Sequence, residues 1–125
     1  MSLRKIILDT SFLMSLVEFS SLDVFIDLFR GYEFLIPESV VKELEDISKK
    51  SNIKGRKAML ILKLLEKVSF KTIESHSDIV DQDILILATK YNAFIATTDR
   101  ELRKKANELG IKVIYFNHGN YIRIQ

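Results

Sequence analysis

The chain has 125 residues and a formal net charge of +2, with 47% hydrophobic and 29% charged residues. This length fits one domain, and the composition is typical of a compact globular protein rather than a disordered one. Cysteine is absent, which excludes disulfide bonds and thiolate metal sites and suits a reducing cytoplasm. No apolar run is longer than that at residues 84–88, far short of the ~20 residues that span a bilayer. We therefore expect a cytoplasmic protein without a membrane partner.

The N-terminal half begins with a predicted strand at residues 5–8, followed by two helices in the segments TSFLMSLVEF and LDVFIDLF. Gly31 follows the second segment, where a glycine is typical of a helix C-terminus. A second strand is predicted at residues 33–36. Pro37 then marks the start of a helix to about residue 49, because its fixed backbone angle suits the first helical position. Apolar residues at helical spacing in SNIKGRKAMLILKLLEKV predict a further helix.

The C-terminal half contains three predicted strands, at residues 70–73, 94–97 and 112–115, separated by helices in DILILATKY and RELRKKANELG. The segment DILILATKY is apolar nearly all round, so it is either deeply buried or forms the contact of a homodimer. Alternation of strands and helices predicts one doubly wound α/β domain over residues 1–125, with a mainly parallel five-stranded sheet between layers of helices. In such a sheet, ligands bind outside the carboxyl ends of the strands.

Acidic residues gather at this edge of the predicted sheet. Asp9 directly follows the first strand, Asp99 follows the strand segment FIATT, and Asp83 stands in the opening turn of its helix. Glu43 borders the apolar stripe of its helix and lacks a basic residue three or four positions onward, unlike the neighbouring acids, so it is predicted to lean inward. The sequence thus predicts four carboxylates in one crevice.

Four carboxylates in a partly buried crevice repel one another, and a divalent cation relieves that repulsion. Oxygen ligands of this kind suit Mg2+ or Mn2+. Such an ion lowers the pKa of a bound water and offsets charge on a phosphate oxygen, which is the chemistry of phosphodiester hydrolysis. We therefore predict that all four acids are catalytic metal ligands. The secondary candidates are a substitute ligand or helix cap and three supporting hydroxyls: Asp81, Thr10, Thr97 and Thr98.

Each acid taken singly also has a structural explanation. Asp9 and Asp99 suit helix N-caps, Asp83 suits the positive end of a helix dipole, and Glu43 suits the border of an amphipathic helix. The combination of two strand-end acids, a helix-start acid and an inward-leaning acid is what favours a metal site. The His and Cys content does not favour zinc, since the two histidines lie far apart and lack companion cysteines.

Two basic clusters flank the segments that carry Glu43 and Asp99. A solvated helix face is the default explanation for such clusters, and the alternative is that they steer a phosphate backbone towards the acids. The candidate RNA-binding residues are Lys50, Lys54, Arg56, Lys57, Arg100, Arg103 and Lys104.

The sequence resembles the PIN-domain ribonucleases in the segments IILDTSFL, IPESVVKELEDI and DQDILILATKYNAFIATTDREL. The resemblance implies a doubly wound sheet, an Mg2+ or Mn2+ pocket, and cleavage of single-stranded or locally unpaired RNA. IPESVVKEL with GRKAMLILKLL is similar to the branch of the ribosomal RNA processing endonuclease and its archaeal relatives. That branch commonly has adjacent acids where this chain has Gln82 beside Asp83, with Asp81 displaced by one position.

Alternative functions follow from the same residues. Toxin nucleases of toxin-antitoxin pairs resemble the chain in the same four acids, so the implied protein partners are an antitoxin or a ribosome-assembly protein. A PIN-like module that binds RNA or protein without cleavage is a further possibility, although such a surface needs no cluster of repelling acids. A haloacid-type phosphatase normally needs a second acid where this chain has Ser11, and no nucleotide-binding glycine motif occurs.

Overall fold

The computed structural model describes residues 3–117 and 121–125, and it shows a six-stranded sheet in the order β3-β2-β1-β4-β5-β6. The first five strands run parallel, and β6 pairs antiparallel with β5. The strands are β1 (Lys5–Leu8), β2 (Glu33–Pro37), β3 (Phe70–Ile73), β4 (Phe94–Ala96), β5 (Val113–Asn117) and β6 (Tyr121–Ile124). The predicted doubly wound, mainly parallel α/β architecture is therefore confirmed. The added strand β6 is four mostly exposed residues, too short to give a clear sequence pattern.

Six helices connect these strands within the described residues. They are α1 (Thr10–Glu18), α2 (Leu22–Leu28), α3 (Glu38–Ser48), α4 (Ile53–Lys67), α5 (Val80–Tyr91) and α6 (Arg100–Glu108). All six match predicted helical segments, with shifts at their ends. The shift that matters is at α5, which begins at Val80 rather than at Asp83, so its first turn includes Asp81.

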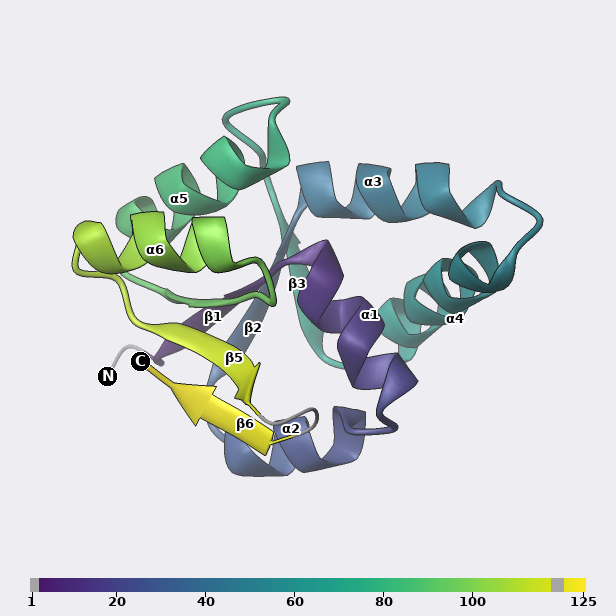
Figure 1. Cartoon of the computed structure of the whole chain (residues 1–125), viewed down its shortest axis with the longest axis horizontal. Helices are drawn as coiled ribbons and strands as arrows, with labels where there is room; N and C mark the ends of the chain where they lie inside the picture. The colour runs from purple at the N-terminus through teal and green to yellow at the C-terminus, as the bar shows by residue number, and fades with distance from the viewer. Residues whose placement is uncertain (1–2, 118–120) are drawn as a thin grey trace.

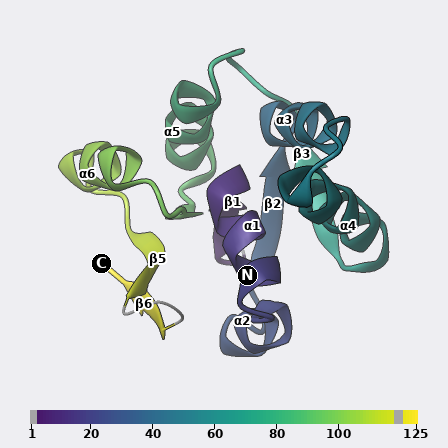
Figure 2. The same ribbon diagram turned by 45° about the vertical axis from the view of Figure 1, so that its right-hand side comes forward.

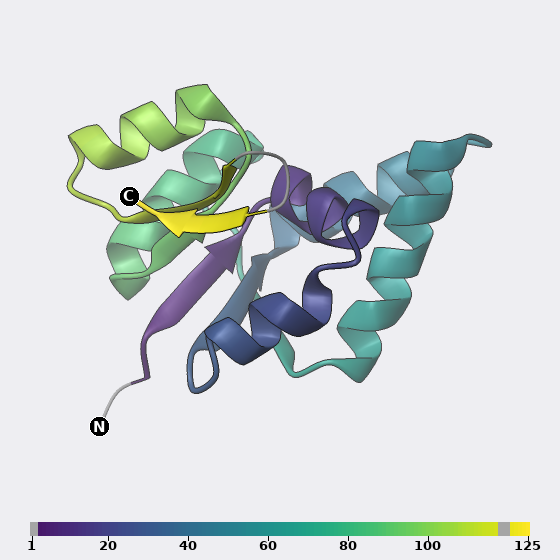
Figure 3. The same ribbon diagram turned by 60° about the horizontal axis from the view of Figure 1, so that its bottom comes forward.

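The helices cover both faces of the sheet. Figures 1 and 2 show α5 and α6 on one side and α1, α2 and α4 on the other, and Figure 3 shows the same division from below. Burial on both faces explains why the central strands read as continuous apolar runs. The fully buried strand residues include Ile6, Ile7, Leu8, Leu35, Ile36 and Ile95. No helix in the described part of the chain combines the length and apolarity needed to cross a membrane.

The order of the strands places β1 at the point where the chain changes direction across the sheet. The connections from β1 lead outward to β2 and β3, and the later strands β4 and β5 are added on its other side. Beyond the strands, the Asp9 N–H donates to the Ala96 carbonyl at 2.9 Å, so the pairing of β1 with β4 continues into the loops. A ligand crevice is expected at the carboxyl end of such a switch point.

Candidate active site

Asp9 is the residue that ends β1 and begins α1. Its Oδ1 accepts a hydrogen bond from the Thr10 N–H at 2.8 Å, which makes Asp9 the N-cap of α1. Its Oδ2 accepts from the Thr97 hydroxyl at 2.7 Å and from the Ser11 hydroxyl at 3.0 Å. The side chain is 5% exposed. The same carboxylate therefore caps α1 through Oδ1 and accepts the two hydroxyls of the candidate site through Oδ2.

The hydroxyls around Asp9 partly match the predicted set. Thr97 is fully buried, donates to Asp9 and accepts from the Asp99 N–H at 3.1 Å, so it ties the two strand-end acids together. Thr10 is buried, and its hydroxyl has no partner within the described residues. Exposed Thr98 contributes its backbone N–H, which donates to Ser11 Oγ at 3.2 Å, and the supporting role of its hydroxyl stays a prediction. Ser11 was missed, although the hydroxyl two positions after a strand-end acid was the available signal.

A cavity of about 500 Å³ opens beside Asp9 at the carboxyl edge of the sheet. Glu43 reaches it from α3, Asp81 from the first turn of α5, and Asp99 from the N-cap of α6. Glu43 is partly buried, as its helical phase predicted. The complete lining consists of Asp9, Thr10, Ser11, Met14, Glu43, Ile47, Lys54, Val80, Asp81 and Asp99. Four carboxylates from four separate elements thus share one cavity.

The electrostatics of this cavity disfavour the ionised forms of Asp9 and Asp81. Burial raises the pKa of Asp9, and the negative charge of Asp81 raises it further, while hydrogen bonds from Thr97, Ser11 and the Thr10 N–H lower it. The pKa of Asp81 is also raised, by burial first, then by the charge of Asp99 and of Glu43, with a lowering contribution from Lys105. Asp81 therefore repels the other three acids of the cavity, whereas the sequence predicted this repulsion for Asp83.

Asp83 is not part of this cavity, and the prediction that it ligates a metal there is wrong for this structure. Its carboxylate is fully buried and accepts three hydrogen bonds: from Ser39 Oγ at 2.6 Å, Ser75 Oγ at 2.7 Å and the His76 N–H at 2.7 Å. Two residues along a helix correspond to a rotation of about 200°, so Asp81 and Asp83 face different sides of α5. Asp81, the secondary candidate, takes the place in the cavity.

The residues of the cavity fit a divalent cation in their chemistry. Carboxylate oxygens are the ligands that Mg2+ and Mn2+ prefer, and the unpartnered Thr10 hydroxyl adds a polar oxygen to the lining. In the described part of the chain, however, no three acidic or histidine side chains are close enough together to hold an ion as they stand. This spacing is expected of acids that repel one another. Asp9, Glu43, Asp81 and Asp99 are the residues that could hold the ion.

The predicted RNA-binding residues lie in two groups, one on α4 and the connection before it and one on α6. Lys54 lines the acidic cavity, whereas Lys57 lies 3.9 Å from Glu18 and faces α1. Lys50 and Arg56 are exposed on the connection of α3 and α4 and on α4 itself. Three residues of α6 border a separate hollow of about 450 Å³: Arg100, Arg103 and Lys104. Of the described basic residues, Lys54 is therefore the one that lines the acidic cavity.

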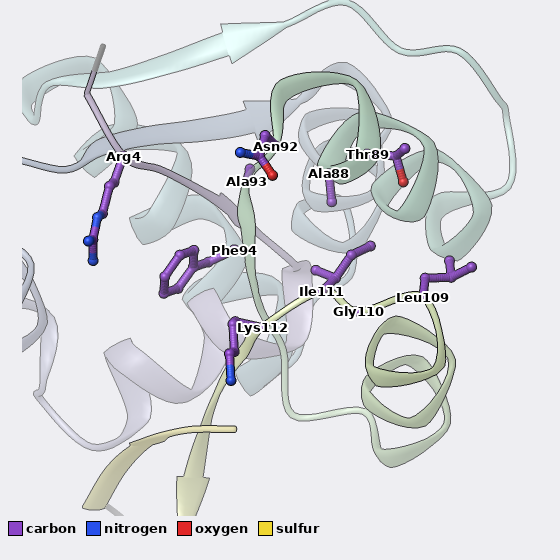
Figure 4. A pocket seen from close by; sticks show the side chains of 10 residues that line it. All are labelled: Arg4, Ala88, Thr89, Asn92, Ala93, Phe94, Leu109, Gly110, Ile111 and Lys112. Atoms are coloured by element: carbon purple, nitrogen blue, oxygen red, sulfur yellow. The ribbon is translucent and has the colours of Figure 1, made fainter. Parts of the chain in front are cut away.

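A cavity of about 330 Å³ lies at the opposite end of the sheet, where α5 and α6 end and β4 and β5 begin (Figure 4). Its charged side chains are Arg4 and Lys112, and the remainder are apolar or neutral polar residues. It contains no carboxylate. The acidic cavity, and not this one, therefore has the donor set for a cation.

Comparison with known proteins gives a consistent relationship. Residues 6–118 match the family described as "PIN like domain". Ribonuclease VapC9 of Archaeoglobus fulgidus is 34% identical over 95 residues, which cover 74% of this chain and 67% of that protein. Ribonuclease VapC4 of Methanocaldococcus jannaschii is 29% identical over 125 residues, which cover 96% of this chain and 95% of that protein.

Solved structures share the fold at lower sequence identity. A domain of a functionally unknown protein from Methanocaldococcus jannaschii superposes with a TM-score of 0.72 at 19% identity, covering 94% of each chain. A PilT N-terminus domain protein from Sulfolobus solfataricus gives a TM-score of 0.54 at 16% identity, covering 89% of this chain and 86% of that one. At these identities the likeness concerns the arrangement of helices and strands.

Proposed function

We propose that this chain, which belongs to the PIN-like domain family, is an endoribonuclease that hydrolyses RNA phosphodiester bonds with Mg2+ or Mn2+. The observation that carries the proposal is the cavity at the switch point of the sheet, which is lined by Asp9, Glu43, Asp81 and Asp99. Two relatives bear the name ribonuclease, which supports RNA as the substrate. The proposal replaces Asp83 with Asp81 in the predicted set of acids.

The residues of the chain prepare the site before any ion binds. A divalent cation, when bound, would lower the pKa of a water molecule and offset the negative charge on phosphate oxygens. Asp9 is held in place by Thr97 and Ser11, whose hydroxyls favour its ionised form. Asp99 uses Oδ1 to cap α6 through the Glu101 and Leu102 N–H groups. Its Oδ2 accepts no hydrogen bond from the described residues, so this oxygen is available to an ion.

The lining also indicates how a substrate phosphate is received. Lys54 stands at the N-terminal turn of α4 and lines the same cavity as the four acids. A lysine ammonium attracts a phosphate as a point charge, and the partial positive charge of a helix N-terminus adds to this attraction. We assign Lys54 to the phosphate of the bound RNA, at or next to the bond that is cleaved. Single-stranded or locally unpaired RNA is the proposed substrate, as the resemblance implies.

The test is cleavage of mixed cellular RNA by the purified chain with Mg2+, Mn2+ or EDTA. We expect cleavage that requires the cation and is lost in Asp9→Asn, Asp81→Asn and Asp99→Asn. Asp46→Asn is the matched control, because Asp46 is an exposed acid on the same helix as Glu43. Cleavage that persists in EDTA, or in all three cavity variants, contradicts the proposal.

A toxin-type ribonuclease with an antitoxin partner is the favoured form of this activity, because two relatives carry the VapC name. RNA maturation, with a ribosome-assembly protein as partner, is the alternative form. A short antitoxin-like reading frame directly upstream of the gene supports the toxin-type role, and its absence supports maturation.

A cytoplasmic location and a homodimer are part of the proposal. For the dimer, Ile86 is 44% exposed on α5, and light scattering that shows only monomer contradicts it.

A further inference from the structure

Asp83 is a buried carboxylate with an unusual set of partners. Its side chain has no exposed surface, and its three hydrogen-bond donors are two hydroxyls and one backbone N–H. No basic side chain of the described residues forms an ion pair with it. Burial of a carboxylate is strongly unfavourable unless its oxygens are hydrogen-bonded. The three bonds therefore hold Asp83 where it is.

The donors come from two different segments. Ser39 belongs to the first turn of α3, while Ser75 and His76 belong to the loop between β3 and α5. The Ser75 hydroxyl also accepts from the Ser39 N–H at 2.7 Å, and the Ser75 N–H donates to Glu38 Oε1 at 3.0 Å. The network thus joins the start of α3, the loop and the start of α5, whose first turns lie side by side (Figure 1).

The two joined helices each carry an acid of the cavity. Glu43 lies four residues after Ser39, on the same face of α3. Asp81 lies two residues before Asp83, on another side of the same turn of α5. A fixed contact between Ser39 and Asp83 therefore fixes the separation of Glu43 from Asp81. Without it, α3 and α5 lose a buried polar connection at the end nearest the cavity.

We propose that Asp83 is a positioning residue, which sets the separation of Glu43 and Asp81 through its hydrogen bonds to Ser39, Ser75 and the His76 N–H. The inference rests on the proposed function, since it assigns Glu43 and Asp81 to a shared cation. It gives Asp83 no contact with the ion or with RNA. Its carboxylate acts on the ion only through the two helices that it joins.

The test uses two serines of the same loop. Ser75→Ala removes the hydroxyl that bridges Asp83 and the Ser39 N–H, whereas Ser77→Ala removes a hydroxyl that contacts the Ile79 N–H and Gln82. Mn2+ affinity is measured by electron paramagnetic resonance of the free ion. We expect Ser75→Ala to bind Mn2+ about tenfold more weakly. Ser77→Ala is expected to stay within about twofold of the wild type.

Amide hydrogen exchange gives a readout that needs no cation. In the metal-free protein, the His76 N–H is expected to exchange slowly, because it donates to the buried carboxylate of Asp83. Exchange should be faster in Ser75→Ala and unchanged in Ser77→Ala. If Ser75→Ala leaves both the exchange of His76 and the affinity for Mn2+ at wild-type values, the inference is overturned.

A double-mutant cycle separates positioning from ligation. If Asp83 acts through Asp81, then Asp83→Asn weakens Mn2+ binding much less in the Asp81→Asn background than in the wild type. Equal losses in both backgrounds overturn the inference in favour of direct ligation by Asp83. A wild type that binds Mn2+ but cleaves no RNA contradicts the proposed function alone, and the affinities still decide the role of Asp83. A wild type that binds no Mn2+ overturns both.

Discussion

The Thr97 hydroxyl lies 2.7 Å from Asp9 Oδ2 and joins the end of β4 to the end of β1. This hydrogen bond lowers the pKa of Asp9 against the effect of burial. Thr97→Val keeps the shape of the side chain but removes the donor, so the pKa of Asp9 rises further. We expect the acid limb of the pH-activity profile to move to higher pH, with activity about tenfold lower on that limb.

The control for this variant is Thr98→Val, which changes an exposed neighbour whose hydroxyl has no hydrogen bond within the described residues. Its pH-activity profile should match that of the wild type. The measurement is kcat/KM against pH at saturating Mn2+. An unmoved acid limb in Thr97→Val would mean that Asp9 does not control activity through its ionisation.

The raised pKa values of Asp9 and Asp81 also predict how metal-free stability depends on pH. A carboxyl whose pKa is higher in the folded chain binds protons more tightly there than in the unfolded chain. The free energy of unfolding is therefore larger below the ordinary pKa of a carboxyl. It decreases as pH rises through the raised pKa values of Asp9 and Asp81. Above the raised pKa values the full penalty is present. A divalent cation is expected to offset it.

Asp81→Asn tests this pH dependence, because the Asp81 carboxylate accepts no hydrogen bond from the described residues. We expect the variant to be more stable than the wild type at neutral pH in EDTA, by about 0.5 kcal/mol, since solvent screens this partly exposed group. The difference should vanish in acid. Urea unfolding at several pH values measures it, with Asp78→Asn, an exposed acid outside the cavity, as the control. A loss of stability at neutral pH contradicts the prediction.

The acids differ in how far the sequence could place them. Asp9 follows β1 directly and Asp99 follows β4 after two threonines, so the edge of the sheet determines where they lie. The helical phase of Glu43 was readable from the apolar stripe of α3. The choice between Asp81 and Asp83 was not readable, because α5 begins at Val80 and its rotation is fixed by partners distant in sequence.

The hydrogen-bond donors to Asp83 could not be identified from the sequence either. Ser39 and Ser75 give no signal on their own, since a serine is common at helix starts and in loops. Their role with Asp83 appears only when β2 and β3 bring α3 and the loop together. The fold, in contrast, depends on apolar runs and helical spacing, which are properties of continuous segments.

Lys54 provides a prediction about RNA affinity. If its ammonium meets a phosphate in the cavity, Lys54→Ala should weaken RNA binding and reduce the slope of log affinity against log salt by about one phosphate contact. Binding is measured with fluorescent RNA in Asp9→Asn, which prevents cleavage. Lys63→Ala, an exposed lysine further along α4, is the control and should change neither quantity. Equal effects of both substitutions would indicate a diffuse electrostatic contribution.

Cation binding should stabilise the folded chain by linkage. At a Mn2+ concentration of about 100 times the dissociation constant, the expected gain is about 2.7 kcal/mol, seen as a rise in Tm that EDTA reverses. Asp9→Asn should lose this gain, because it removes one of the carboxylates that line the cavity. Asp46→Asn should keep it. A Tm that responds to Mn2+ equally in both variants would place the ion elsewhere.

Gly55 makes a prediction about the turn that carries Lys54. A Cβ at this position would lie 1.9 Å from the Lys50 carbonyl oxygen, so the backbone of the α3–α4 connection must move to accept any side chain. Gly55→Ala should lower the free energy of unfolding by about 2 kcal/mol. Ser51→Ala, an exposed change in the same connection, should be close to neutral. Because the Gly55 N–H is also the group capped by Asn52 at 2.8 Å, the displacement reaches the first turn of α4. The affinity for RNA should therefore fall together with the stability. A destabilised variant with unchanged affinity would indicate that Lys54 does not contact the RNA.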